Sequence, residues 1–273
     1  MPHYHFISGL PRSGSTLLAG ILRQHSDFHA AMSSPVAGLM NGLLEQTGAS
    51  SEFFSFFSPE KRMNIITAMF NAYYQEELDK TVIFDTSRIW TARMHQLKGL
   101  FEDFKVVCCV RNPAWIADSF ELIYRKNPFE YSRMFTPTSR QTVYSRCESL
   151  MASNGTIGQP LMALKEAYYG EYSDKLLLVD YDLLTQYPQK CLSLIYQFLG
   201  LPEYNHDFDN VVYEESEFDE RIGASGLHKV SRKVEFHPRR SILPPDLFDK
   251  YKELAFWEDN KGTQASIIGK PNS

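Results

Sequence analysis

The residue types best suited to chemistry lie near the amino terminus, in the segment Gly9-Leu-Pro-Arg-Ser-Gly-Ser-Thr16. Its glycines permit backbone angles that other residues resist, so successive N–H groups can curl around phosphate oxygens. The hydroxyls of Ser13, Ser15 and Thr16 add hydrogen-bond donors, and Arg12 adds a cation. This pattern predicts a phosphate-binding loop.

The segments on either side of this loop fit the same interpretation. Residues 3–8 alternate as a strand does, and residues 15–25 carry apolar side chains at helical spacing. The amino terminus of such a helix favours an anion. A loop for nucleoside triphosphates has a lysine after its second glycine, whereas this chain has Ser15 there. The absent lysine makes chemistry on a triphosphate less favourable.

A second arginine-containing segment follows another apolar run. Residues 105–110 read Lys-Val-Val-Cys-Cys-Val and end at Arg111, and Ser119 follows eight residues later. Pro113 is tolerated in the first turn of a helix, so Ser119 lies about two turns along it. Arg111 offers a bidentate clamp for a phosphate, and Ser119 offers a neutral donor.

The elements that position these residues indicate an α/β protein. Short apolar runs that end in polar residues lie at 82–84, 105–110 and 176–179, as is typical of parallel strands covered on both faces. Ligands bind outside the carboxyl ends of such strands. We therefore expect a P-loop-like three-layer sandwich, with a central, mostly parallel sheet flanked by helices. Residues 1–262 are expected to form a single domain, and 263–273 a flexible tail.

Composition limits the classes of partner. The net charge is −5 and the chain has no basic run, which argues against a nucleic-acid partner. No apolar stretch is long enough for a transmembrane segment. The four cysteines lack metal or redox spacing, so we expect buried, reduced thiols and a cytoplasmic setting. No metal site is expected, and nothing in the sequence indicates an oligomeric state.

The two phosphate motifs resemble those of the sulfotransferase superfamily that uses 3′-phosphoadenosine 5′-phosphosulfate (PAPS). Residues 11–18, Pro-Arg-Ser-Gly-Ser-Thr-Leu-Leu, are similar to the family's 5′-phosphosulfate loop, particularly as found in tyrosylprotein sulfotransferases. Residues 111–119 resemble the family's 3′-phosphate site. The resemblance implies a bacterial-type enzyme that transfers a sulfuryl group from PAPS to a hydroxyl acceptor and releases 3′-phosphoadenosine 5′-phosphate (PAP).

The resemblance also implies which residues hold the donor. They are Pro11, Arg12, Ser13, Gly14, Ser15, Thr16, Arg111, Ser119, Tyr181, Lys229 and Arg232. Tyr181 follows the strand-like run 176–179, and a role in the core suits it equally well. Lys229 and Arg232 occupy the place of the family's late nucleotide-covering loop, although a solvated basic loop explains them as well.

The acceptor's proton requires a base, and two interpretations of Asp85 remain open. Family members carry a histidine or a carboxylate after the second strand-like region, and this chain has Asp85 there. Asp85 is therefore the candidate base, while Arg12 is the candidate for stabilising the developing charge. Alternatively, Asp85 caps the end of its strand. Residues 31–34 lack the acidic pair of tyrosylprotein sulfotransferases, which argues against a peptide tyrosine as acceptor.

Two other functions compete with sulfuryl transfer. A small-molecule or nucleotide kinase with a degenerate phosphate loop requires ATP and magnesium, and the missing loop lysine argues against it. A non-catalytic nucleotide-binding module is the second alternative, because a fold alone does not fix a function.

Overall fold

The computed structural model describes residues 2–126, 129, 135–213, 230 and 233–269. Within them, the strands are β1 (His3–Gly9), β2 (Phe28–Ala30), β3 (Val82–Thr86), β4 (Val106–Val110), β5 (Leu176–Asp180) and β6 (Ser266–Ile268). The α-helices are α1 (Ser15–Leu22), α2 (Val36–Thr47), α3 (Pro59–Tyr73), α4 (Met94–Leu100), α5 (Pro113–Lys126), α6 (Val143–Met151), α7 (Gly158–Tyr169), α8 (Tyr181–Gln186), α9 (Pro188–Leu199) and α11 (Pro245–Lys252).

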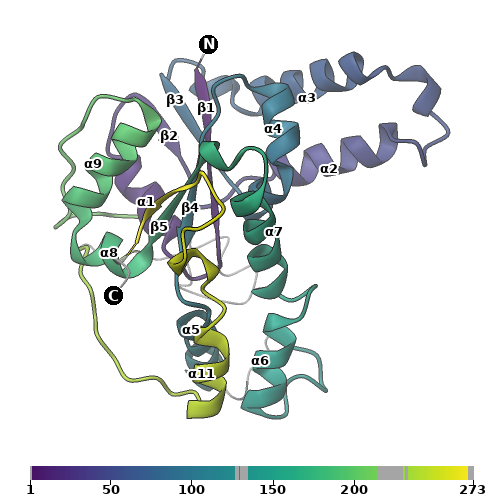
Figure 1. Ribbon diagram of the computed structural model, residues 1–273. Coiled ribbons are helices and arrows are strands. Elements are labelled where there is room, and N and C mark those ends of the chain that lie inside the picture. The colour runs from purple at the N-terminus through teal and green to yellow at the C-terminus, as the bar shows by residue number, and fades with distance from the viewer. Residues whose placement is uncertain (1, 127–128, 130–134, 214–229, 231–232, 270–273) are drawn as a thin grey trace.

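The strands form one parallel sheet in the order β2-β3-β1-β4-β5-β6 (Figure 1). The register aligns Ile7 of β1 with Thr86 of β3 on one side and with Val107 of β4 on the other. Since all strands run in the same direction, their carboxyl ends share one edge of the sheet. The segments that follow β1, β3, β4 and β5 therefore begin side by side at that edge.

Helices cover both faces of the sheet, which gives the expected three layers. On one face, α1, α8 and α9 pack on the side chains that include Ile7, Val107 and Val179. On the other face, helices including α3, α5 and α7 pack on Phe6, Val106 and Leu178. Figure 1 shows α2 and α3 extending side by side away from the sheet. The P-loop-like α/β sandwich predicted from the sequence is confirmed.

Local sequence explains where several helices begin and end. Pro113 lies in the first turn of α5, as expected. The Asp180 carboxylate accepts a hydrogen bond from the Leu183 N–H and caps α8. Gly200 ends α9 with a φ of 70°, a left-handed conformation that suits glycine at this position.

Cys108 and Cys109 show that the central strand is buried on both faces. Cys108 points into one core cluster and Cys109 into the other, as the alternation of strand side chains requires. All four cysteines are free and buried, as expected. Burial raises the pKa of the Cys109 thiol to about 12, so it is held as an unreactive thiol.

The carboxyl-terminal segment corrects one expectation. Residues 263–273 were expected to form a flexible tail, but Ser266–Ile268 form β6 and pair with β5. The Ile268 side chain is buried against the same core as α9. Two adjacent isoleucines suffice for an edge strand here because β5 presents an unpaired edge to them.

Candidate functional site

The phosphate loop joins β1 to α1 at the carboxyl edge of the sheet. Arg12 has a φ of 58° and Gly14 a φ of 93°, and such left-handed residues turn successive N–H groups toward one side. Gly14 precedes α1, and no side chain caps the helix. The first N–H groups of α1 therefore have no side-chain acceptor, as an anion-binding helix terminus requires.

The three hydroxyl residues of the loop divide into two groups. Ser13 is buried, and its hydroxyl contacts the carbonyl oxygens of Leu10 and Cys109, the latter at 2.7 Å. Its side chain therefore holds the loop against β4 and leaves only its backbone N–H for an anion. Ser15 and Thr16 are half-buried, and within the described part of the chain no hydrogen-bond partner engages their hydroxyls. These two hydroxyls are available to a ligand.

Pro11 and Gly9 determine how the loop leaves the sheet. Pro11 is buried beneath the loop, so its role is to shape the turn. Gly9 has a φ of 126°, and a Cβ at this position would lie 2.1 Å from the Cys109 carbonyl oxygen. Only glycine allows β1 and β4 to approach so closely at the start of the loop.

Arg12 connects the loop to the second predicted motif. Its Nε donates a hydrogen bond of 3.3 Å to the Ser119 hydroxyl on α5. The remainder of the Arg12 side chain is exposed. The structure thus brings the loop and the Arg111–Ser119 segment together across 107 positions in the sequence.

Tyr181 forms a second connection between the two motifs. The Arg111 guanidinium carbon lies 4.4 Å from the centre of the Tyr181 ring, within the range of a cation–π contact. The same ring lies against Gly14, where an added Cβ would be 2.8 Å from Tyr181 Cδ2. Tyr181 therefore packs between the loop and Arg111, and the predicted residues of three strand ends form one cluster.

Arg111 carries unused hydrogen-bonding capacity. Its Nε is buried and has no hydrogen-bond partner, which is costly for a guanidinium unless a ligand engages it. Burial lowers the pKa of Arg111, and the nearby Arg239 acts in the same direction. An orphaned donor on a buried cation is a feature that a phosphate group would satisfy.

Asp118 fixes the chain segment that carries Arg239. Its carboxylate accepts hydrogen bonds from the Ser241 hydroxyl at 2.7 Å and from the Ile242 N–H at 2.8 Å, and it forms an ion pair with Arg239. Because Asp118 is adjacent to Ser119, this clamp holds a second cation near Arg111. The sequence analysis missed Asp118, since a single acidic residue on a helix carries no recognisable spacing.

Asp85 lies inside the fold beneath the end of β3. It is fully buried and accepts three hydrogen bonds, from the Ser34 hydroxyl at 2.6 Å, the Tyr74 hydroxyl at 2.7 Å and the Trp90 indole N–H at 2.7 Å. Burial raises the pKa of Asp85, while these three donors act in the opposite direction. The carboxylate therefore has no surface of its own for an acceptor to contact.

The remaining predicted residues lie elsewhere or outside the described residues. Lys229 and Arg232 fall outside the described residues. Among the described residues, no group of three or more metal-ligating side chains is arranged to hold an ion. The helices within the same ranges are all too short or too polar to cross a bilayer.

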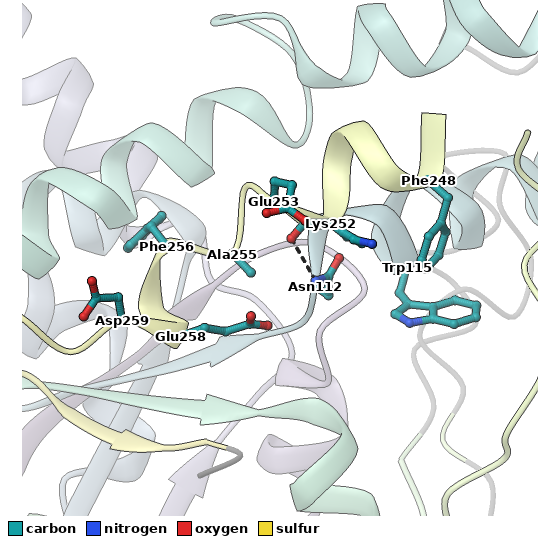
Figure 2. Close-up of a pocket in the computed structure, with 9 residues that line it drawn as sticks. All are labelled: Asn112, Trp115, Phe248, Lys252, Glu253, Ala255, Phe256, Glu258 and Asp259. Atoms are coloured by element: carbon teal, nitrogen blue, oxygen red, sulfur yellow. Dashed lines mark hydrogen bonds between the residues drawn. The ribbon is translucent and has the colours of Figure 1, made fainter. Parts of the chain in front are cut away.

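A cavity of about 620 Å³ opens beside the first turn of α5 (Figure 2). Asn112 and Trp115 line one wall, and the Asn112 side chain donates a 3.1 Å hydrogen bond to the Lys252 carbonyl oxygen. Three carboxylates line the cavity and outnumber its single lysine. This excess of negative charge makes the cavity unsuitable for a phosphorylated nucleotide, which the cationic cluster around Arg12 and Arg111 suits better.

Comparison with known proteins identifies the family. The model of the sulfotransferase family matches residues 5–206, which include the phosphate loop, Asp85, the Arg111–Ser119 segment and Tyr181. The chain therefore belongs to the sulfotransferase family, and it is an enzyme of that class. PAPS is the sulfuryl donor of this family. Family membership sets aside the kinase and the non-catalytic module.

Solved structures agree with the fold. The sulfotransferase domain from the curacin biosynthetic pathway is 17% identical, with a TM-score of 0.53, and the match covers 93% of this chain and 92% of that one. The sulfotransferase domain from the Synechococcus PCC 7002 olefin synthase is 19% identical, with a TM-score of 0.45 and coverage of 92% and 87%. The sulfotransferase from Alicyclobacillus acidocaldarius is 15% identical, with a TM-score of 0.48 and coverage of 81% and 90%. No curated protein matches the chain.

Proposed function

We propose that this enzyme transfers the sulfuryl group of PAPS to a hydroxyl-bearing acceptor by in-line displacement and releases PAP. The observation that carries the proposal is the meeting of two phosphate-binding segments. Arg12 of the loop contacts Ser119 of α5, and Tyr181 packs between Gly14 and Arg111. Such a cluster offers two anionic binding positions close together, as a nucleotide with phosphates at both its 3′ and 5′ positions requires.

Each phosphate position has its own group of residues in this proposal. The N–H groups at the start of α1, with the hydroxyls of Ser15 and Thr16, bind the 5′-phosphate. Arg111 and Ser119 bind the 3′-phosphate, and the orphaned Arg111 Nε supports this assignment. The Tyr181 ring, fixed by Gly14 and Arg111, flanks the nucleotide between the two positions.

The chemistry follows from where charge develops. The donor supplies an activated sulfuryl group and a phosphate leaving group, so negative charge grows on the bridging oxygen. Arg12 lies in the loop that binds this phosphate, and its exposed guanidinium is the cation we assign to that charge. Asp85 is assigned as the base that ultimately receives the acceptor's proton. Positioning and charge stabilisation then account for most of the rate enhancement.

We also place the enzyme in the cytoplasm. The four cysteines are free and buried, and free thiols are typical of proteins from reducing compartments. Fractionation of cells that express the tagged chain, probed with a tag-specific antibody, tests this assignment.

Turnover by the full-length chain tests the proposed reaction. The purified protein is incubated with PAPS and, in turn, with 4-nitrophenol, 1-octanol, cholesterol and butylamine, and the products are measured by mass spectrometry. A sulfated hydroxyl product with stoichiometric release of PAP supports the proposal. Sulfation of the amine alone, or transfer from ATP and magnesium but not from PAPS, contradicts it.

A further inference from the structure

Asp85 presents a problem for the reaction, because a base must exchange a proton with the acceptor. The Asp85 carboxylate is fully buried, and three donors occupy its two oxygens. Two of these donors, Tyr74 and Trp90, are themselves buried in the core. Only the third, Ser34, is partly exposed. Among the described residues, Ser34 is therefore the one hydrogen-bond partner of Asp85 that also reaches the surface.

Ser34 lies at the carboxyl edge of the sheet, close to the phosphate loop. Its backbone N–H donates to the Thr86 carbonyl oxygen at 2.9 Å, which holds it at the end of β3. The segment after β3 is in turn fastened to β1. The Ser87 N–H donates to the Ile7 carbonyl oxygen, and the Ser8 hydroxyl donates to the Arg88 carbonyl oxygen. Because β1 and β3 are neighbours, Ser34 stands about one strand spacing, ~5 Å, to the side of the strand that leads into the loop.

The hydrogen bonds of the Ser34 hydroxyl suit proton transfer. Its proton points to Asp85 Oδ2 over 2.6 Å, a short distance typical of a charge-assisted bond. Its oxygen accepts a 3.3 Å hydrogen bond from the Val36 N–H at the start of α2, and the positive end of that helix stabilises negative charge on the oxygen. A hydroxyl oxygen accepts two hydrogen bonds, so one acceptor position on Ser34 remains for a substrate hydroxyl.

We propose that Ser34 receives the proton of the acceptor hydroxyl and passes its own proton to Asp85, so that Ser34 and Asp85 act together as the general base. The inference rests on the sulfuryl transfer proposed above. The acceptor oxygen forms a bond to sulfur as the bond from sulfur to the bridging oxygen breaks, and that electron pair leaves on the 5′-phosphate of PAP. In the same step the acceptor proton moves to Ser34 Oγ and the Ser34 proton moves to Asp85 Oδ2. After product release the proton returns through Ser34 to water.

The surroundings of Asp85 support this role. Tyr74 and Trp90 keep the carboxylate oriented toward Ser34 during the transfer. Burial raises the pKa of Asp85, which makes it a stronger base than an exposed aspartate. The titratable groups that face it are Tyr4, Tyr73 and Tyr74, and burial raises the pKa of each of these phenols. They therefore remain protonated while Asp85 titrates.

The test compares Ser34→Ala with two matched variants. Ser34→Thr keeps the hydroxyl, and Ser33→Ala removes a neighbouring exposed hydroxyl. With saturating PAPS and 1-octanol, Ser34→Ala is expected to lower kcat by about 10²- to 10⁴-fold, Ser34→Thr to retain most of the wild-type kcat, and Ser33→Ala to match the wild type. PAP affinity, measured by calorimetry, stays within about twofold in all three variants, since none of them alters the phosphate cluster.

The acidity of the acceptor separates a proton-transfer role from a structural one. 4-Nitrophenol is already largely ionised at neutral pH and needs no base, so Ser34→Ala is expected to retain most of its activity toward it. In the wild type, kcat toward 1-octanol falls with decreasing pH as Asp85 becomes protonated, and Ser34→Ala lacks this acidic limb. Asp85→Asn, if it folds, shows the same pattern, and the double variant is no slower than the slower single variant.

Three outcomes overturn the inference. They are an unchanged kcat toward 1-octanol in Ser34→Ala, an equal loss toward both acceptors, and a Ser34→Thr variant as slow as Ser34→Ala. Failure of the wild type to sulfate any hydroxyl would instead contradict the proposed function itself, and it is recognised before any variant is made.

Discussion

Arg12 Nε lies 3.3 Å from the Ser119 hydroxyl oxygen and donates a hydrogen bond to it. This contact connects the loop after β1 with the helix after β4, two segments that each look like an ordinary phosphate contact when taken alone. Together they create a cationic cluster whose members approach from neighbouring strand ends. The geometry of the whole donor site depends on this convergence.

Replacing Arg12 should mainly affect the chemical step. Arg12→Ala is expected to lower kcat by about 10²- to 10³-fold, because a donor aimed at the developing charge is lost. Arg12 also has a φ of 58°, a conformation that costs a non-glycine residue about 1 kcal/mol. Arg12→Gly should therefore lose as much activity as Arg12→Ala while unfolding at a higher denaturant concentration. A kcat of Arg12→Ala within threefold of the wild type would remove Arg12 from the mechanism.

Gly14 should tolerate no side chain. Gly14→Ala places a Cβ 2.8 Å from Tyr181 Cδ2 at a φ of 93°, so we expect a loss of stability of about 1–3 kcal/mol and weaker PAP binding. Combining it with Tyr181→Ala removes the clash, and the two effects should be non-additive by at least about 0.5 kcal/mol. Gly42→Ala is the control, since nothing lies within 4 Å of its added Cβ. It should stabilise α2 by up to about 1 kcal/mol. Additive effects at positions 14 and 181 would contradict the packing described here.

Two buried histidines should make the fold less stable in mild acid. Burial lowers the pKa of His5 and of His206 to about 4, below the ordinary value of about 6.5. Between these values the unfolded chain binds more protons than the folded one, so stability is fully present above pH 6.5 and declines as the pH falls toward 4. Each histidine contributes up to about 1.4 kcal/mol per pH unit over this window.

Denaturant titrations at several pH values check this expectation. His206→Gln should reduce the slope of stability against pH between 4 and 6.5, relative to the wild type. The exposed His237→Gln is the matched control and should leave the slope unaltered. An identical slope in His206→Gln and the wild type would show that His206 does not titrate in this way.

Much of the fold was predictable from the sequence because the central strands are continuous apolar runs. The runs 105–110 and 176–179 correspond to β4 and β5, and burial on both faces leaves no other arrangement for them. The edge strands β2 and β6 were not predicted. Each has only three residues, and they form because β3 and β5 offer them backbone partners, which no local pattern records.

The site was predictable to the extent that its chemistry requires particular residues in a loop. Glycines, hydroxyls and arginines at fixed spacing identify the loop and the Arg111–Ser119 segment. Asp85 was singled out for its place at a strand end, but its burial and its link to Ser34 depend on the packing of α2 and α3 against β3. Ser13 illustrates the converse, since its hydroxyl belongs by type to the site and by packing to the core.

The affinity ratio between PAP and adenosine 5′-monophosphate tests the central claim most directly, because the two nucleotides differ by the 3′-phosphate. Calorimetry on the wild type should show tighter binding of PAP. In Arg111→Ala, PAP affinity should fall about tenfold to a hundredfold, as expected for lost charge-assisted hydrogen bonds, while the affinity for the monophosphate changes little. The ratio would then approach one. An unchanged ratio in Arg111→Ala would mean that Arg111 does not bind the 3′-phosphate and that the two segments do not serve one nucleotide.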